Sequence, residues 1–340
     1  MENILKILVT GNLGYVGSHL TDILVNTGHE VTGIDLELYP KAQCGRLTKP
    51  YKQLKSDFRK ITDKEFIGMD TVVHLGGLSN DPTGELNAGL TSSINGQGTE
   101  NLARMAKKNG VKRFIFASSC SIYGSQGQKP RLEDDETNPL TEYAASKLYA
   151  EKQLMKINDK NFETYILRNA TAYGSSKVMR QDLVINELTA RMKINGTAKL
   201  NSNGNQWRPF IHAQDMARVF AYVAENPEPK ISGKPINIGS NNENYQIKDV
   251  CNIIEGFFPN QNISISNQSI NDPRDYRVDF TLFEKTYPDF KFKYQLVEGI
   301  RDLISHYTDI NYTKQEIDKN RYIRISELRH NLTIIQSQFQ

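Results

Sequence analysis

The chain has 340 residues, enough for one large domain or two closely joined domains with a sizeable hydrophobic core. Its 42 basic and 39 acidic residues nearly balance, and the net charge of +3 argues against nucleic acid or an anionic membrane as the partner. No stretch approaches the ~20 apolar residues of a transmembrane helix, and the N-terminus begins directly with a core strand, which argues against a signal peptide. Cys44, Cys120 and Cys251 are far apart and lack metal-ligand spacing, so we expect a reducing, cytoplasmic setting and no metal site.

The first predicted element is a short apolar strand over residues 4–9, which leads directly into Gly11, Gly14 and Gly17. A strand that turns into a helix through glycines lets the backbone approach a pyrophosphate, whose charge then lies at the helix N-terminus. The spacing is G-x-x-G-x-x-G rather than the commoner G-x-G-x-x-G. Three glycines also suit a tight turn that binds nothing, so the motif needs support from its surroundings.

The second predicted strand, residues 30–35, ends in Asp35. A carboxylate at this place accepts hydrogen bonds from the ribose hydroxyls of NAD and repels the additional phosphate of NADP. A solvated acid at a strand end is the alternative. Strand, glycine turn, helix, strand and acid in this order favour a dinucleotide site and predict NAD.

Strand-like and helix-like segments then alternate, which predicts a parallel sheet covered by helices on both faces, a Rossmann-like doubly wound α/β fold. The expected strands cover residues 70–75, 112–117, 162–167 and 236–239, and the expected helices cover 95–109, stopped by Gly110, and 141–157. Ligands in this architecture bind beyond the carboxyl ends of the strands.

The pattern loosens after about residue 175, where we expect a smaller, interleaved C-terminal substrate-binding domain. The polar stretch 197–208 predicts a hairpin or a substrate-facing loop. The predicted organisation is an NAD-binding domain over residues 1–175 with returning segments near 209–240, a substrate-binding domain over 176–208 and 241–310, and peripheral helices over 311–340.

Tyr143 and Lys147 lie one turn apart on the predicted helix 141–157. A tyrosine is a poor base near neutral pH because its pKa is about 10, and a nearby ammonium group lowers that pKa by favouring the phenolate. An exposed helix pair is the alternative for these two residues alone. Ser118 and Ser119, at the end of the preceding strand, add hydroxyls that can hold a substrate oxygen.

Taken together, these motifs resemble the extended short-chain dehydrogenases/reductases of the NAD-dependent nucleotide-sugar epimerase/dehydratase family. The resemblance spans nearly the whole chain and rests on Gly11-x-x-Gly14-x-x-Gly17, Asp35, His74-Leu75-Gly76-Gly77, Ser118-Ser119-x-x-x-Tyr123-Gly124, Tyr143-x-x-x-Lys147, Arg168 through Tyr173-Gly174, and Trp207-Arg208-Pro209-Phe210-Ile211-His212.

The resemblance implies a role for each matching position. Tyr143 matches the catalytic base, Lys147 its partner on the nicotinamide ribose, and Ser119 the hydroxyl that steadies the sugar oxygen. The cofactor-binding positions are Gly11, Asn12, Leu13, Gly14, Tyr15, Val16, Gly17, Asp35, Asp57, Phe58, Leu75, Gly76, Gly77, Ser118, Tyr143 and Lys147. The substrate-binding positions are Ser119, Cys120, Ser121, Tyr143, Arg208 and Arg274, where Arg208 and Arg274 would clamp the diphosphate of a nucleotide sugar. The segment around Arg274 departs from the usual R-P-G-D pattern, so Arg277 is an alternative to it, and solvated surface charges are the alternative for both arginines.

The implied reaction is removal of a proton from a sugar hydroxyl at C4 by Tyr143, with hydride transfer to a retained NAD, as in an epimerase. Relatives that dehydrate carry Asp-Glu after the catalytic hydroxyl, where this chain has Cys120-Ser121, and neither side chain replaces a carboxylate well. A 4-ketoreductase, a C3/C5 epimerase that uses Cys120 as acid or base, a dehydratase, and a non-catalytic dinucleotide sensor remain as alternatives. Cys120 as a packed core residue also remains open.

Further expectations concern neighbouring positions and assembly. Thr171 stands where many relatives have Asn, which leaves the orientation of the substrate open, whereas His74 and His212 are expected to be structural. Relatives pair through two long helices, so a homodimer through residues 95–109 and 141–157 is expected.

Overall fold

The computed structural model describes residues 4–45, 49–79, 85–125, 129–266 and 274–328. Within these ranges, seven parallel strands form the central sheet in the order β10-β6-β5-β4-β1-β2-β3. The strands are β1 (Lys6–Thr10), β2 (Glu30–Asp35), β3 (Lys52–Lys55), β4 (Thr71–His74), β5 (Arg113–Ser119), β6 (Glu163–Asn169) and β10 (Pro235–Ile238). The chain reverses its direction across the sheet at β1, and such a reversal opens a crevice beyond the strand ends. The predicted Rossmann-like α/β fold class is confirmed.

Alternating residues of β1 are buried against opposite faces of this sheet. Ile7 and Val9 belong to a cluster that includes residues of α1 (Gly17–Asn26) and α7 (Ala213–Glu225). Leu8 belongs to a second cluster, shared with α4 (Thr99–Lys108) and α5 (Glu142–Ile157). A strand buried on both sides reads as a continuous apolar run, which is why residues 4–9 were recognisable in the sequence.

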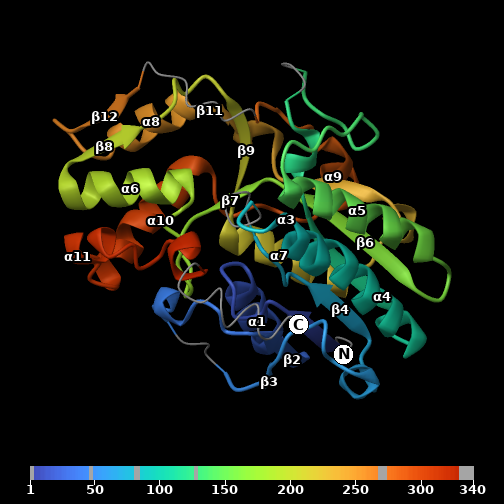
Figure 1. Cartoon of the computed structure of the whole chain (residues 1–340). Coiled ribbons are helices and arrows are strands. Elements are labelled where there is room, and N and C mark those ends of the chain that lie inside the picture. Colours follow the sequence, from blue (N-terminus) through green and yellow to red (C-terminus); the bar gives the residue numbers. More distant parts are fainter. Residues whose placement is uncertain (1–3, 46–48, 80–84, 126–128, 267–273, 329–340) are drawn as a thin grey trace.

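A third buried cluster lies outside the central sheet and includes residues from three helices and a pair of parallel strands. These elements are α6 (Val184–Asn195), α8 (Ile247–Glu255), α10 (Leu296–Asp309), β8 (Thr197–Leu200) and β12 (Asn262–Ile265). Figure 1 shows them gathered on the other side of the molecule from α4 and α5. The predicted domain boundaries stay predictions.

The polar stretch 197–208 does not form the expected hairpin. Its first residues form β8, which pairs with β12, and its last two begin β9 (Trp207–His212). β9 lies between β7 (Thr171–Tyr173) and β11 (Asn244–Gln246) in a three-stranded sheet. The two halves of the stretch therefore pair with strands that are distant in sequence.

The helix expected from residue 95 has an irregular start in the structure. Helical structure begins earlier, at α3 (Ala88–Thr91), and passes through a π-helical turn, Ser92–Gly98, before α4. A Cβ atom at Gly96 would lie 3.1 Å from the ring of Tyr149 on α5, so the missing side chain allows close approach of the two helices. The predicted end holds, because α4 is followed by Gly110 at φ +80°.

The C-terminal segment, as far as residue 328, packs against the rest of the molecule, and the expectation of peripheral helices over residues 311–340 stays a prediction. It contains α11 (Lys314–Asp318) and a further helical stretch over 324–328. Tyr322 is buried in the third cluster and Leu328 in the cluster of α4 and α5. The segment therefore connects the two halves of the molecule.

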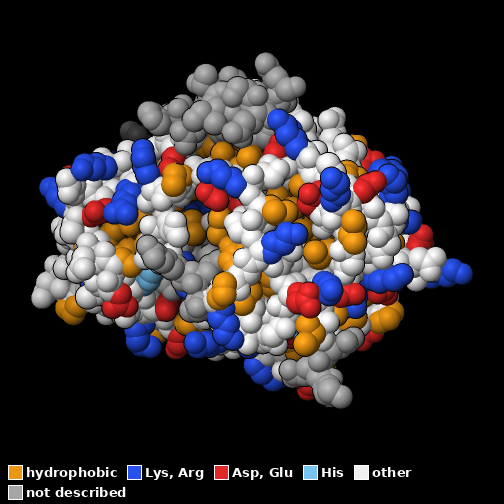
Figure 2. Space-filling view, turned by 90° about the horizontal axis from the view of Figure 1, so that it is seen from below, with side chains coloured by type: hydrophobic (Ala, Val, Ile, Leu, Met, Phe, Trp, Pro, Cys, Tyr) orange, Lys and Arg blue, Asp and Glu red, His pale blue; other side chains and the backbone are white. Residues whose placement is uncertain are grey.

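The short helix α9 (Thr281–Thr286) contacts β10, at the edge of the central sheet. On the face in Figure 2, basic and acidic side chains are interspersed with apolar ones. Across the described residues, none of the helices combines the length and apolar character that a bilayer crossing requires.

Candidate active site

A cleft of about 390 Å³ lies beyond the carboxyl ends of the strands at the centre of the sheet, within the usual range for a small-molecule site. Most of the residues predicted from the sequence line it. They are Gly11, Leu13, Gly14, Tyr15, Val16, Gly17, Asp35, Asp57, Phe58, Leu75, Gly76, Gly77, Ser118, Ser119, Ser121, Tyr143, Lys147 and Arg274. The structure thus brings together residues that are up to 263 positions apart, from Gly11 to Arg274 (274 − 11 = 263).

The glycine turn between β1 and α1 has room for glycine alone at two positions. Gly11 has φ +72°, and a Cβ atom there would lie 2.7 Å from the backbone nitrogen of Gly76. A Cβ atom on Gly17 would lie 2.0 Å from the carbonyl oxygen of Gly11. The chain needs these glycines to start α1 directly at the cleft, which leaves backbone N–H groups at a helix N-terminus facing a ligand.

The acids expected at the adenosine end are both held in place by the backbone or by a cation. Asp35 accepts hydrogen bonds from the backbone N–H groups of Leu13 (3.2 Å) and Glu37 (2.7 Å). Burial raises the pKa of Asp35, and these two N–H groups oppose that shift. Asp57 forms an ion pair with Arg59 at 3.0 Å. Both carboxylates are therefore oriented before any ligand arrives.

The predicted catalytic groups come from the start of α5 and the end of β5. Thr141 caps α5, accepting from the backbone N–H of Ala144 (3.2 Å), and so fixes the first turn, which carries Tyr143. The buried Lys147 Nζ donates to the carbonyl oxygen of Ala117 (2.8 Å) and lies 5.8 Å from the ring centre of Tyr143. Burial lowers the pKa of Lys147 to about 8.

Ser119 ends β5 with its hydroxyl on the cleft. Its Oγ accepts from the backbone N–H of Ser121 (3.2 Å), at the start of the 3₁₀ turn Cys120–Tyr123. That contact leaves the Ser119 O–H available as a donor to a substrate oxygen. The neighbouring Ser118 instead directs its hydroxyl to Glu151, away from the cleft, and reaches the site through its backbone.

Three predicted site residues, Asn12, Cys120 and Arg208, are not among the residues that line the cleft. Asn12 is fully buried and donates to Tyr51 (3.0 Å) and Gln53 (2.6 Å), so its amide braces the glycine turn from behind. The Cys120 thiol is in the core and donates to the carbonyl oxygen of Arg168 (3.1 Å). Burial raises the pKa of Cys120 well above its usual value, which disfavours a thiolate. The 3₁₀ turn, which the sequence did not reveal, directs this side chain inward.

The third residue off the cleft is Arg208, which the family pattern assigned to the substrate diphosphate. Its guanidinium donates to the carbonyl oxygen of Trp207 (2.7 Å) and lies 5.3 Å from the ring centre of Tyr276. Tyr276 lines the cleft, so Arg208 lies behind it. Arg274 is on the cleft, and the alternative, Arg277, stacks 4.6 Å above Trp207. Residues 272 and 273 of the same motif fall outside the described residues.

A set of buried, hydrogen-bonded polar residues supports the part of the cleft that contains the predicted catalytic residues. Glu151 pairs with Arg168 at 2.8 Å, and Arg168 also donates to the hydroxyl of Tyr123 (2.9 Å). His74 is fully buried between the hydroxyls of Thr10 (2.6 Å) and Thr99 (2.9 Å). Desolvation lowers the pKa of His74 well below its usual value, as suits a structural residue.

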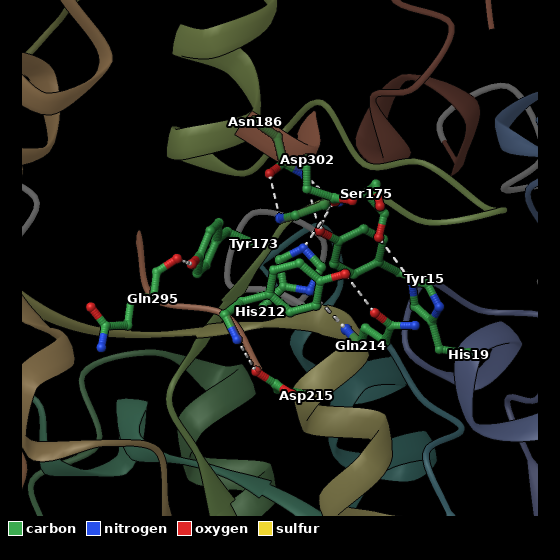
Figure 3. A network of polar contacts seen from close by, with 12 residues as sticks. Tyr15, His19, Tyr173, Ser175, Asn186, His212, Gln214, Asp215, Gln295 and Asp302 are labelled. Carbon is green, nitrogen blue, oxygen red and sulfur yellow. Dashed lines mark hydrogen bonds and ion pairs between the residues drawn. The ribbon is translucent and has the colours of Figure 1, made fainter. Parts of the chain in front are cut away.

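A second network joins the glycine turn to the neighbouring half of the molecule (Figure 3). The Tyr15 hydroxyl donates to the carbonyl oxygen of Gly174 (2.6 Å) and accepts from Asn186 on α6 (3.1 Å). Asp302 on α10 contacts the His212 ring (3.1 Å), which stacks on Tyr294 at 3.9 Å. His212 is thus structural here, and Tyr15 links the cofactor turn to α6.

Several residues of the cleft were missed in the sequence. They include Tyr39, Lys177, Arg180 and Arg324. Lys177 and Arg180 follow the recognised Tyr173-Gly174 motif, so a cluster of basic residues there was a usable signal. Nothing in the sequence near Arg324 indicated the site, because its placement depends on contacts with distant segments.

Comparison with known proteins agrees with this geometry. The sequence profile of the NAD dependent epimerase/dehydratase family matches residues 7–239. A putative UDP-glucose 4-epimerase of Methanocaldococcus jannaschii is 28% identical over 322 residues, covering 90% of this chain and 100% of that protein.

Solved structures show the same fold at lower identity. TunA, an NAD-dependent NDP-hexosamine 5,6-dehydratase, superposes with a TM-score of 0.80 at 23% identity, over 90% of this chain and 98% of that one. UDP-glucuronic acid 4-epimerase from Bacillus cereus, in complex with UDP-glucuronic acid and NAD, gives a TM-score of 0.78 at 24% identity, over 90% of this chain and all (100%) of that one.

The residues of the cleft fit a dinucleotide of this kind. The glycine turn forms a cradle that a Cβ atom would fill, and the buried Arg324 has Nε and Nη2 atoms without a hydrogen-bond partner among the described residues. A hydride acceptor also needs a proton-transfer group beside it, and Tyr143 and Lys147 share the cleft with the glycine turn. The chain therefore belongs to the NAD-dependent epimerase/dehydratase family of nucleotide-sugar enzymes and uses NAD as its cofactor.

Proposed function

We propose that the protein is a nucleotide-sugar epimerase that oxidises a sugar hydroxyl, at C4, transiently and retains its NAD between turnovers. The observation that carries the proposal is the shared lining of one cleft by Tyr143, Lys147, Ser119 and the glycine turn. The similarity to a putative UDP-glucose 4-epimerase along 90% of the chain supports it.

In the proposed mechanism, Tyr143 removes the proton of the sugar hydroxyl and Ser119 donates a hydrogen bond to the oxygen as it becomes a carbonyl. Bound NAD supplies the acceptor for the hydride that leaves the same carbon. After the keto sugar turns in the cleft, Tyr143 returns the proton to the oxygen, and the cofactor held at the glycine turn would supply the hydride to the other face of the carbon. Proton and hydride are both restored, so the reaction has no net redox change.

Lys147 has a supporting role in this scheme. With a pKa lowered to about 8, its ammonium is largely charged at pH 7 and stabilises the phenolate of Tyr143. Its hydrogen bond to Ala117 fixes the position of Nζ. The residue can also hold a ribose hydroxyl, as the family pattern implies.

The substrate is proposed to be a nucleoside-diphosphate sugar. Arg274 on the cleft suits the diphosphate, because a guanidinium binds phosphate through two parallel hydrogen bonds. Two of the named relatives are a putative UDP-glucose 4-epimerase and a UDP-glucuronic acid 4-epimerase, so UDP-glucose and UDP-glucuronic acid are the first substrates to test.

A cytoplasmic homodimer is proposed as the working form, paired through α4 and α5. Tyr149 and Met155 on α5 are 40% and 45% exposed, which gives that helix an apolar surface. Light scattering at micromolar concentration measures the molar mass of the protein in solution and so distinguishes a monomer from a dimer. If the wild type and Met155→Asp are both monomeric, the proposed pairing is wrong.

The deciding experiment starts from the purified full chain. We expect denaturation to release about one NAD(H) per chain, measured by absorbance and mass. The protein is then incubated with UDP-, dTDP-, GDP- and CDP-sugars in heavy water. An isomeric product without solvent deuterium supports C4 epimerisation. Deuterium at C3 or C5, loss of water, or turnover only with added NAD(P)H would replace it by a C3/C5 epimerase, a dehydratase or a ketoreductase, respectively.

A further inference from the structure

A buried cation reaches the cofactor cleft from the far end of the chain. The Arg324 side chain is 5% exposed and lines the cleft. Its Nη1 donates to the hydroxyl of Ser79, and its guanidinium carbon lies 4.5 Å from the ring centre of Tyr39. Its Nε and Nη2 atoms are buried without a hydrogen-bond partner in the described part of the protein.

Such a group is costly to bury unless something completes its hydrogen bonds. Burial and the neighbouring Arg180 lower the pKa of Arg324, although the carboxylates of Asp182 and Asp35 oppose this shift. Arg180, the cation that acts on it, is already paired with Asp182 at 2.7 Å. The open donors of Arg324 therefore point to an anionic ligand.

The position of the guanidinium identifies which anion. Nη2 lies 4.0 Å from the place that a Cβ atom on Gly14 would occupy, so it faces the turn at the N-terminus of α1. A dinucleotide places its pyrophosphate at that turn. The ribose end is less suitable for this anion, because the carboxylate of Asp35, which lines the cleft there, would repel an added phosphate.

The backbone around Arg324 is anchored on both sides of the cleft. The N–H of Gln181 donates to the carbonyl oxygen of Tyr322 (2.9 Å), and the Arg321 side chain donates to the carbonyl oxygen of Lys41 (3.1 Å). Leu328 is buried with the sheet. These contacts hold the Arg324 guanidinium at a defined place before a ligand binds.

We propose that Arg324 binds the pyrophosphate of NAD beside the glycine turn, so that the C-terminal segment 313–328 forms part of the cofactor site. The guanidinium would donate through Nε and Nη2 while Ser79 keeps Nη1 in place. The proposal rests on NAD as the cofactor and is independent of which sugar is the substrate or how it is changed.

The test compares ligands that differ in their phosphates. The full chain is stripped of NAD, and the affinities of NAD, ADP-ribose, adenosine and UDP are measured by competition calorimetry. We expect Arg324→Met to weaken NAD and ADP-ribose about tenfold to a hundredfold and to change adenosine by less than twofold, since adenosine has no phosphate. Arg324→Lys should lose less affinity for these two ligands, because lysine keeps the positive charge although it lacks the planar guanidinium that forms two parallel hydrogen bonds.

The matched control is Lys319→Met, an exposed cation on the same segment that does not line the cleft, and we expect its NAD affinity to stay within twofold. Thermal unfolding of the stripped protein separates binding from folding. A binding role predicts that Arg324→Met leaves the melting temperature of the stripped protein unchanged or raised but reduces the increase that NAD produces. If this variant fails to fold, the same ligand series on Arg324→Lys decides.

Three results would overturn the proposal: NAD affinity within threefold of wild type in a folded Arg324→Met, an equal loss for adenosine and ADP-ribose, or a loss for UDP without a loss for ADP-ribose. The last would place Arg324 on the substrate diphosphate. None of these measurements requires turnover, so an incorrect epimerase assignment would leave the result readable.

Discussion

Tyr143 and Lys147 show how much a pair of residues depends on its surroundings. One turn of α5 separates them, yet it is the carbonyl oxygen of Ala117 at the end of β5 that fixes the lysine. The spacing was visible in the sequence because helix geometry follows from local pattern. The burial that lowers the pKa of Lys147 was not, because it arises from β5 and the sheet beneath.

Replacement of Tyr143 by Phe tests the proton-transfer role. We expect turnover to fall about a hundredfold or more while NAD stays bound, since the change removes only the hydroxyl. Steady-state rates and the NAD content of the purified variant are the measurements. Activity within threefold of wild type would show that another group is the base.

The buried ammonium of Lys147 predicts a pH dependence of stability with a definite sign. Its pKa is about 8 in the folded chain and near 10.4 when unfolded. Between these values the unfolded chain binds more protons, so this residue makes the free energy of unfolding rise with pH. Relative to Lys147→Met, wild type should gain about 2 kcal/mol between pH 8 and 9.5.

Denaturant unfolding of both proteins across that range measures the effect. The comparison with the variant removes the contributions of other titrating groups, including the thiols and phenols whose pKa values burial raises. Parallel stability curves for the two proteins would contradict the lowered pKa of Lys147.

Cys120 and Asn12 mark the limit of sequence reasoning for single residues. Both occupy positions that the family pattern places at the site, and both side chains turn away from it. The 3₁₀ turn after β5 and the packing of the glycine turn against Tyr51 decide their directions. Residue type and spacing do not encode such local rotations.

At the scale of elements, the sheet was largely predictable and the second half of the molecule was not. Strands β1, β2, β4, β5, β6 and β10 each gave an apolar run that the sequence revealed, because they are buried on both faces. β8 was missed because it has only four residues, alternately exposed and buried, inside a polar stretch. Such a short alternating segment leaves little local signal.

The link between the glycine turn and α6 gives a prediction for stability. Tyr15→Phe removes a buried hydroxyl that bonds both Gly174 and Asn186, so their polar atoms lose a partner. We expect the free energy of unfolding to fall by about 1–3 kcal/mol. Thr308→Val, which removes an exposed hydroxyl bonded to the carbonyl oxygen of Ile304, is the control and should change it by less than about 0.5 kcal/mol.

Chemical denaturation of the two variants and of the wild type measures these changes in the free energy of unfolding. Equal effects of the two substitutions would mean that the Tyr15 hydroxyl contributes no more than a surface contact. Because the Tyr15 ring stays on the cleft, NAD affinity is expected to change little.

At the scale of the whole molecule, the C-terminal segment joins the sheet, the third cluster and the cofactor cleft. The ring centres of Tyr322 and Tyr312 lie 5.4 Å apart. Leu328 is buried in the cluster that includes residues of β2 and α4. The sequence suggested helices at the edge because scattered apolar residues in a charged stretch resemble a surface helix. The burial of Leu328 depends on distant segments of the chain, among them those that carry Ile34 and Leu102.

Hydrogen exchange on the stripped and NAD-bound protein tests this arrangement. We expect NAD to slow exchange in residues 313–328 as well as in residues 11–18, since both segments border the same ligand. Helix α9, none of whose residues lines the cleft, serves as an internal reference. Protection limited to residues 11–18 would separate the C-terminal segment from the cofactor site.

The reactivity of the three cysteine thiols can report the order in which parts of the protein unfold. Cys120 is buried against the central sheet and Cys251 in the third cluster, while Cys44 is half-buried at the edge of the latter. Burial raises the pKa of all three, so the folded protein should react slowly with alkylating reagents. Pulsed alkylation followed by peptide mass mapping can then follow each half by its own cysteine. Simultaneous labelling of Cys120 and Cys251 would reveal one cooperative unit, and staggered labelling would reveal which half opens first.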